Sequence, residues 1–310
     1  MKTIIVKLAD QDNRLDKFLT LKLKISRSQV QKLITSGAVL LNDKIPTVHE
    51  FLTPGDLITV DQKKKPTPLI QETAKAAPTP KFKLLAEEPD YLIIEKPSGL
   101  LVHPTTRGEK NTLIDQLLKK YPALTKIGGD PGRPAIVHRL DREVSGLMIV
   151  PKTQAAFDYF KHLFQTRKIK KEYLALVHGV VSEDHAQIDF PIARSGSGLY
   201  VARPRRSTDG KKSLTEIDVI KRFVNFTYLL ALPHTGRTNQ IRVHLNAINH
   251  PIVGDALYAA RLREEKSKIK LKRVFLHATK LSFTDLTGKK KVFESKLPKS
   301  LGLLLQLLKS

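Results

Sequence analysis

The sequence predicts an α+β protein of two unequal domains. The small domain has two helices followed by strands, and the large one has a mixed, mainly antiparallel β-sheet flanked by helices. Three observations predict this class. Helical and strand-like spacings alternate along the chain without a regular βαβ repeat. Residues 62–81, QKKKPTPLIQETAKAAPTPK, hold almost no bulky apolar residue and so read as a solvated linker. No Walker A or Gly-x-Gly-x-x-Gly pattern indicates a nucleotide-binding sheet.

Length and charge bound the domains and their partners. We expect a small domain over residues 1–61, a linker over 62–81 and a large domain over 82–310. The formal net charge is +24, and the large domain holds 40 of the 54 basic residues. Such an excess favours a polyanion, either nucleic acid or an anionic membrane surface, over the alternative of a basic protein without such a partner.

Cysteine usage and hydropathy exclude further classes. The chain has no cysteine, which excludes disulfides, thiolate metal sites and a cysteine nucleophile. The apolar patch in MKTIIVKLAD is too short for a signal peptide, and no apolar run approaches the roughly 18 residues of a membrane span. We therefore expect a cytoplasmic protein with no membrane partner.

The small domain is predicted to run helix, helix, strand. Its first helix repeats apolar residues at helical spacing: Leu15, Phe18, Leu19 and Leu23. The second, in SRSQVQKLITSG, opens with the capping-box pair Ser26 and Gln29 and ends at Gly37. Asn42-Asp43 favours a tight turn, and Pro54-Gly55 leads into a final strand.

Along the large domain the same spacing rules predict elements in a fixed order. They are strand, turn and strand in YLIIEKPSGLLVHP (91–104), helices in NTLIDQLLKKY (111–121) and TQAAFDYFKHLFQTR (153–167), a strand in KEYLALVHG (171–179), paired strands in TEIDVIKRF (215–223) and FTYLLALP (226–233), a helix with Ile241 and Leu245, and a strand in RVFLHATKLSF (273–283). Tyr173 could face either the core or a cleft, and Arg242 lies near the first turn of the last helix.

The stretch HRLDREVSGLMIV, residues 138–150, places four charged residues between two β-prone runs, 135–137 and 147–150. We expect both runs to be strands, Ser145-Gly146 to be a turn, and 138–144 to be a loop that exposes Asp141 at a strand end.

Asp141, between Arg139 and Arg142, has two interpretations from chemistry alone. It is either a structural ion pair or a carboxylate kept ionised for work as a nucleophile or base. Basic surroundings favour the second when the substrate is a polyanion. His138 and His244 lack partners at metal-ligand spacing, and no Gly-x-Ser-x-Gly elbow indicates a serine hydrolase.

The small domain resembles the S4 RNA-binding domain from RLDKFLTLKLKISRSQVQKLITSGAVLLNDK to PGDLITV, over about residues 14–60. The resemblance implies that the basic face of its helix pair meets RNA phosphates. The residues concerned would be Lys22, Lys24, Arg27 and Lys32. Each taken singly could equally be an ordinary solvated helix position.

HRLDREVSGL resembles the H-R-L-D-x-x-T-S-G-L signature of RluA/RluC/RluD-type RNA pseudouridine synthases. Three further segments resemble motifs of that family and occur in its order: EKPSGLLVHP, KEYLALVHG and TGRTNQIRVHLNAINHPIVGDALY. The resemblance, with the S4 domain, covers most of residues 14–285. It implies the pseudouridine synthase fold for the large domain.

The resemblance assigns roles to individual residues. Asp141 would be the catalytic aspartate, acting through a covalent adduct or a glycal intermediate, two routes that stay open. Tyr173 would stack on the target base, with a proton relay as a second role, and Arg242 would pair with Asp141. Arg139 would help to extrude the uridine by filling its place in the RNA stack, and Leu276 would form an apolar floor beneath the base.

A second set of residues follows from the same resemblance. The segment RSGSGLYVARPRRSTDGKK is similar to an RNA-gripping loop of the family, although a merely solvated basic loop is the alternative. Its phosphate-binding residues would be Arg203, Arg205 and Arg206. The sequence departs from the family pattern at Val144, Asn239 and Pro151, none of which is a residue with an implied catalytic role.

The implied function is isomerisation of specific uridines to pseudouridine in RNA, most of all in large-subunit ribosomal RNA, by a monomer that needs no metal or cofactor. The alternative is a non-catalytic RNA-binding or ribosome-assembly protein, which would have no need of a carboxylate in a basic cleft. A metal-dependent nuclease is a third class, but the sequence shows no carboxylate cluster for it.

Overall fold

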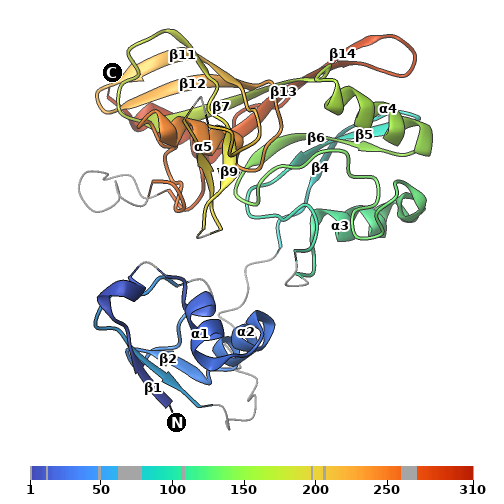
Figure 1. Ribbon diagram of the computed structural model, residues 1–310. Helices are drawn as coiled ribbons and strands as arrows, with labels where there is room; N and C mark the ends of the chain where they lie inside the picture. Colours follow the sequence, from blue (N-terminus) through green and yellow to red (C-terminus); the bar gives the residue numbers. More distant parts are fainter. Residues whose placement is uncertain are drawn as a thin grey trace. The chain divides into compact units, whose positions relative to one another are not determined.

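The computed structural model describes residues 2–11, 13–47, 50–61, 79–105, 109–196, 198–204, 207–259 and 271–309. The chain forms two compact units, Met1–Ala77 and Pro78–Ser310 (Figure 1). The expected linker, 62–81, lies outside the described residues as far as residue 78, so the domain limits given above stay a prediction.

The first unit has the predicted pair of helices followed by strands, and a further strand, β1, lies ahead of the first helix. It contains β1 (Lys2–Ile5), a 3-10 turn η1 (Leu8–Asp10), α1 (Leu15–Leu23), α2 (Arg27–Thr35), β2 (Val39–Leu41) and β3 (Leu57–Val60). The antiparallel sheet has the order β1-β3-β2. The capping box is confirmed, since the Ser26 N–H donates to Gln29 Oε1 at 2.9 Å and the Gln29 N–H to Ser26 Oγ at 3.3 Å.

The second unit is built on a large mixed sheet. Its elements are β4 (Lys83–Glu87), β5 (Tyr91–Lys96), α3 (Leu113–Lys120), the 3-10 helix η2 (Pro122–Lys126), β6 (Ser145–Pro151), α4 (Gln154–Gln165), β7 (Lys170–His178), β8 (His185–Ile188), β9 (Ile192–Arg194), β10 (Tyr200–Ala202), β11 (Thr215–Phe223), β12 (Phe226–Pro233), α5 (Gln240–Ala247), β13 (Leu276–Thr284), β14 (Lys290–Glu294) and α6 (Lys299–Leu307). The strand order is β4-β5-β6-β13-β7-β12-β11-β8, with β14 paired to β13. All these pairs are antiparallel except β6 with β13, which confirms the predicted α+β class.

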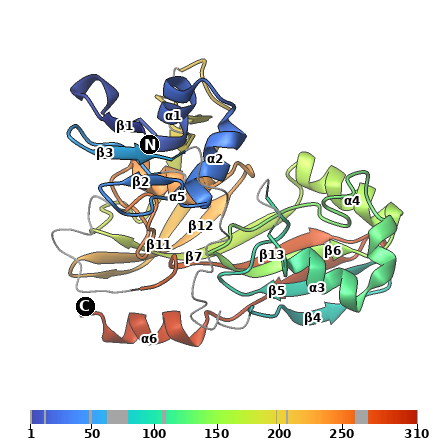
Figure 2. The same cartoon turned by 90° about the horizontal axis from the view of Figure 1, so that it is seen from below.

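Helices cover both faces of the sheet at its β5–β6 end. Leu92 and Ile94 of β5 share a buried cluster with Leu113 of α3, whereas Ile93 packs in another cluster with Phe160 of α4. Successive side chains of a strand point to opposite faces, so α3 and α4 lie on opposite sides of β5 and β6 (Figures 1 and 2). Burial of both faces explains why these strands read as continuous apolar runs rather than alternating ones.

The parallel contact between β6 and β13 places the functional loop. In its register Gly146 lies beside Ala278, which in turn lies beside Tyr173 of β7. Gly146 has φ +124°, and a Cβ there would come within 2.3 Å of the Ala278 carbonyl oxygen. Only glycine permits this approach. The loop that ends at β6 is thereby held close to the start of β7.

Three local predictions were wrong. Residues 100–102 form no strand, because the Leu101 and Val102 carbonyls accept the first backbone N–H groups of α3 at 2.8 and 3.1 Å. Residues 135–137 are also irregular, since Ala135 has φ +56° and donates to the Ile127 carbonyl at 2.9 Å. Ser145-Gly146 is not a turn but begins β6.

The leucine-rich end of the chain forms α6, which the spacing analysis left unassigned. Leu301 of α6 is fully buried in the main core. After the helix, the Lys309 carbonyl accepts a hydrogen bond from Val224 in the turn between β11 and β12. No helix in the described part of the chain is long and apolar enough to cross a membrane.

Candidate active site

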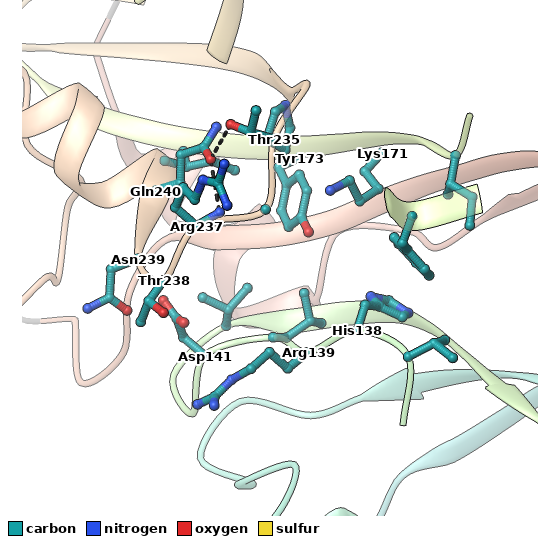
Figure 3. A pocket seen from close by; sticks show the side chains of 18 of the residues that line it. His138, Arg139, Asp141, Lys171, Tyr173, Thr235, Arg237, Thr238, Asn239 and Gln240 are labelled. Carbon is teal, nitrogen blue, oxygen red and sulfur yellow. Dashed lines mark hydrogen bonds between the residues drawn. The ribbon is translucent and has the colours of Figure 1, made fainter. Parts of the chain in front are cut away.

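A cleft of about 690 Å³ opens in the second unit. Its walls are the loop over residues 136–144, the C-terminal end of α4, the start of β7 and the loop over 233–239 that leads into α5 (Figure 3). Of its described lining residues, many are basic and one, Asp141, is a carboxylate. Such a surface attracts an anionic substrate and holds a single acid within it.

The single acid is paired with an arginine from the opposite wall. Arg242 Nη1, in the first turn of α5, donates to Asp141 Oδ2 at 3.1 Å across about a hundred residues of sequence. The Asp141 side chain is 21% exposed and that of Arg242 is 9% exposed. Within the described residues, no hydrogen bond is made to Asp141 Oδ1. One oxygen is thus held while the other has no hydrogen-bond donor among these residues.

A second carboxylate, which the sequence reasoning did not single out, fixes the arginine. Asp255 is completely buried and binds Arg242 in a bidentate manner, Oδ2 to Nε at 2.7 Å and Oδ1 to Nη2 at 2.8 Å. It also accepts the backbone N–H groups of Leu257 and Tyr258. The carboxylate in the quoted motif segment VGDALY was the signal that could have revealed it. A bidentate pair leaves the guanidinium only one orientation.

Electrostatics keep Arg242 charged. Burial alone lowers the pKa of Arg242, but the hydrogen bonds and charge of Asp255, followed by those of Asp141, outweigh it and raise that pKa above its usual value. The arginine is therefore a permanent cation beside Asp141.

Asn239, which departs from the family pattern, also contacts this arginine. Its Oδ1 accepts from Arg242 Nη1 at 3.3 Å, and its Nδ2 donates to the Tyr258 hydroxyl at 3.2 Å. The Tyr258 hydroxyl in turn donates to the Tyr200 carbonyl of β10 at 2.9 Å, and the guanidinium of Arg242 lies over the Tyr258 ring. Asn239 has φ +56°, a conformation that asparagine tolerates well. The departure therefore keeps a polar support for Arg242.

Tyr173 faces the cleft from β7 and is 8% exposed (Figure 3). Burial first, and the charge of Asp141 second, raise the pKa of its phenol well above the usual range. The ring is therefore neutral at physiological pH. It offers a flat aromatic wall opposite the carboxylate, which suits stacking on a base.

Both ends of the Asp141 loop are tied to the sheet. Lys96 is completely buried at the end of β5, and its amine donates to the carbonyls of Leu100, Pro97 and Arg142 at 2.8, 2.9 and 3.1 Å. Burial lowers the pKa of Lys96 to about 7. At the other end, His138 Nε2 accepts the Ile149 N–H at 3.0 Å, and burial lowers the pKa of His138 to about 3. A neutral imidazole is the form that can accept this bond.

The remaining residues expected here also line the cleft. Arg139 Nη1 lies 3.1 Å from His103 Nε2, on the same wall as Asp141. Leu276, the first residue of β13, is buried and contributes an apolar surface. Arg142, for which the sequence suggested no role, donates to the Gly99 carbonyl at 3.2 Å and is not among the lining residues. Five predicted residues therefore meet in one cleft: Asp141, Tyr173, Arg242, Arg139 and Leu276.

The other predicted RNA-binding residues lie elsewhere. Lys22 and Arg27 belong to the first unit, where the Lys22 amine lies 5.2 Å from the Phe18 ring centroid and Arg27 Nε binds Asp16 Oδ2 at 2.8 Å. Lys24 ends α1 in a left-handed conformation. Arg203, after β10, lies with Nε 3.0 Å from Asp209 Oδ2. The side chain of Lys32, together with Arg205 and Arg206, lies outside the described residues.

The described residues contain no group of three or more side chains of the kinds that could hold a metal ion. His244, considered above as a ligand, uses both ring nitrogens within the protein, Nδ1 with Thr215 Oγ1 and Nε2 with the Phe190 carbonyl, each at 2.9 Å. It serves to join α5 to β11.

Comparisons with known proteins agree with the site. Residues 90–247 match the family described as RNA pseudouridylate synthase, and residues 13–58 match the S4 domain. An uncharacterized RNA pseudouridine synthase of Aquifex aeolicus is 38% identical over 256 residues, 81% of this chain and 78% of the relative. The ribosomal large subunit pseudouridine synthase D of Nitrosomonas europaea is 34% identical over 290 residues, 92% of this chain and 81% of the relative.

The solved structure of human RNA pseudouridylate synthase domain containing 4 superimposes with a TM-score of 0.57 at 26% identity, covering 73% of this chain and 94% of that one. A carboxylate held by a buried arginine in a cationic cleft suits an enzyme with a polyanionic substrate, and the matched family is one of RNA-modifying enzymes. The chain belongs to the RNA pseudouridylate synthase family, and it isomerises uridine to pseudouridine in RNA. The expected family, fold and enzyme class are confirmed, and the non-catalytic alternative is not favoured.

Proposed function

We propose that the substrate is large-subunit ribosomal RNA and that Asp141 is the group that acts on the ribose of the target uridine. The carrying observation is the asymmetry of Asp141, which lines the cleft: its Oδ2 is held by Arg242, whereas its Oδ1 accepts no hydrogen bond within the described residues. The name of the Nitrosomonas europaea relative and the S4 domain, an RNA-binding module, support ribosomal RNA as the substrate.

The reaction conserves every atom of the substrate except one exchangeable hydrogen. Asp141 either attacks carbon 1′ of the ribose or removes a proton from carbon 2′, and in both routes the bond from uracil N1 to carbon 1′ breaks. The freed uracil turns and carbon 5 bonds to carbon 1′. In the first route the bond from Asp141 to carbon 1′ breaks as this bond forms, and in the second route Asp141 returns the proton to carbon 2′. The proton on carbon 5 then leaves, and N1 gains one. Arg242 keeps Asp141 oriented throughout.

The other cleft residues handle the base. Tyr173 provides a stacking surface for the uracil while it is detached, and Leu276 closes the cleft beneath it. Arg139 leaves the wall that carries Asp141 and occupies the position that the flipped uridine vacates in the RNA. That occupation offsets part of the few kcal/mol that unstacking costs.

Basic side chains outside the cleft bind the remainder of the RNA. Lys22, Lys24, Arg27 and Lys32 contact phosphates from the S4 domain, and Arg203, Arg205 and Arg206 do so from the segment after β10. Phosphate contacts are individually replaceable, so each contributes little alone. We further propose that the enzyme acts as a monomer in the cytoplasm.

Release of tritium from RNA labelled at carbon 5 of uridine tests the activity directly. Purified protein, incubated with a transcript of large-subunit ribosomal RNA in the absence of metal and nucleotide, is expected to release it. Pseudouridine mapping of ribosomal RNA from cells with and without the gene then identifies the target positions. Release only from another class of RNA would contradict the proposed substrate and leave the enzyme class intact.

A further inference from the structure

Lys171 lines the same cleft and has no role in the proposed reaction. It precedes Tyr173 by two residues on β7, so both side chains leave the same face of that strand. Figure 3 shows its amine beside the Tyr173 ring, across the cleft from Asp141 and Arg139. Its Nζ is 5.9 Å from the centre of the Phe164 ring, and a Cβ on Gly236 would be 4.0 Å from it.

Within the described part of the chain, this amine has neither a carboxylate within ion-pair distance nor a hydrogen-bond acceptor. Burial is the cause that lowers the pKa of Lys171, to about 8. The amine is therefore still mainly protonated at neutral pH. Its titratable neighbour His138 is neutral and already accepts the Ile149 N–H, so it supplies no counter-charge. A cation in such a place costs free energy unless something neutralises it.

Three other cations at or beside the cleft have partners within the protein, whereas Lys161 and Arg167 of its lining are exposed to solvent. Arg242 has Asp255 and Asp141, the Lys96 amine has three carbonyls, and Arg139 contacts His103. Asp141 is the sole carboxylate among the described lining residues and is already paired. The neutralising group for Lys171 must therefore come from the substrate.

We propose that Lys171 binds a phosphate oxygen of the RNA backbone next to the nucleotide that enters the cleft. This inference rests on the proposed function and names a positioning residue for it. A phosphate is the anionic group that RNA carries at every nucleotide, and a charge-assisted bond in a partly buried site is stronger than one to a neutral base carbonyl. Anchored on the strand that carries Tyr173, the phosphate fixes the distance from the backbone to the stacking surface.

Salt dependence of binding tests the contact. Affinity of full-length Lys171→Met for an in vitro transcript of large-subunit ribosomal RNA is measured over a series of KCl concentrations. Loss of one phosphate contact is expected to weaken binding several-fold and to lower the slope of log affinity against log salt by about 0.7 to 0.9. Lys171→Arg retains the charge and is expected to retain the slope.

Lys170→Met is the matched control, because Lys170 is the adjacent residue on β7, is exposed and does not line the cleft. It removes the same charge, so an equal change in slope for both variants would overturn the proposal. The thermal unfolding midpoint distinguishes binding from a structural role, because loss of a structural side chain would lower that midpoint. Removal of an unneutralised buried ammonium is expected to leave the midpoint of Lys171→Met unchanged or raise it.

Two further outcomes would also overturn the proposal. An unchanged slope with a reduced kcat would mean that the amine acts on the base instead. A loss of fold in Lys171→Met, with Lys171→Gln folded and of wild-type slope, would mean that the side chain has only a structural role. The slope is a binding measurement, so it decides this inference even if no ribosomal transcript is modified, a result that would contradict the proposed function alone.

Discussion

Each unit of the protein contains one cluster of arginine and aspartate, and the two clusters are built in opposite ways. In the first unit a single buried carboxylate, Asp16, collects donors from Arg14, Arg27 and Gln31 at 2.8 to 3.1 Å. In the second unit a single buried guanidinium, Arg242, collects two carboxylates. In the first arrangement the carboxylate of Asp16 has several donors, whereas in the second the guanidinium of Arg242 has several acceptors.

The difference separates structure from chemistry. Burial alone raises the pKa of Asp16, but hydrogen bonds from Arg14, Gln31 and Arg27 outweigh it and lower that pKa, so the carboxylate is committed to joining α1 and α2. Asp255 is committed in the same manner to Arg242. Asp141, sharing an arginine that is already held, receives one hydrogen bond from the described side chains, at Oδ2, which leaves Oδ1 for the substrate in the mechanism that we propose.

The largest effect is expected at Asp141. Asp141→Asn removes the carboxylate that acts on the ribose, so tritium release should fall by at least about 10³-fold. Arg242 keeps its bidentate partner, so the free energy of unfolding should change by less than about 1 kcal/mol. Parallel activity and urea-unfolding measurements check both numbers. Full activity in this variant would remove the proposed role.

The next effect sharpens the role of Asp255 as an orienting group. Asp255→Asn frees Arg242 to rotate, and the misplacement of Asp141 that follows should lower kcat by about 10²-fold. The same change breaks a buried ion pair and should cost about 3 kcal/mol of stability. Asn239→Ala, which removes the 3.3 Å contact with Arg242 and the 3.2 Å hydrogen bond to the Tyr258 hydroxyl, is the milder variant and should cost less than tenfold. A larger loss of kcat in Asn239→Ala than in Asp255→Asn would contradict the assignment.

Asp16→Asn tests the other side of the comparison. Loss of the buried charge leaves Arg14 and Arg27 without their shared anion and should destabilise the first unit by about 3 to 5 kcal/mol. At saturating RNA, kcat should change by less than about twofold, since this carboxylate takes no part in the reaction. Limited proteolysis with steady-state kinetics distinguishes the two effects. A fall in kcat as large as that of Asp141→Asn would break the comparison.

The smallest effect is a pH dependence of stability from Lys96. Its pKa is lowered to about 7 in the folded chain, so the unfolded chain binds more protons between about pH 7 and pH 10.5. This residue therefore makes stability rise with pH across that window. The rise in urea midpoint from pH 7 to pH 9.5 should be smaller in Lys96→Met than in the wild type. An equal rise in the two proteins would show that burial does not disfavour the charged form of this amine.

Much of the fold followed from local patterns. Helical spacing located α1 through Leu15 and Leu19, and the capping box at Ser26 and Gln29 located the start of α2. These signals act within a few residues, so sequence contains them. The runs at 100–102 and 135–137 failed for the complementary reason. Apolar β-prone residues form a strand only beside a partner strand. In these two runs the backbone groups form hydrogen bonds with a helix start or a loop instead.

The motifs placed Asp141, Tyr173 and Arg242 in one candidate site by resemblance, and the pairing of Asp141 with Arg242 is seen in the structure. They did not indicate Asp255, nor that Arg142 turns away to Gly99. Charge pairing over a hundred residues depends on which strands become neighbours, and that depends on contacts such as Gly146 against Ala278.

By itself, then, the sequence determined the two-part α+β organisation, the loop that exposes Asp141 and the basic character of the surface around it. Only the tertiary structure decided which carboxylates are saturated, and that Lys171 is a half-buried cation without an ion-pair partner among the described residues. The physical reason is that secondary structure follows short-range spacing, whereas the state of a charged group depends on burial and on partners brought from distant segments.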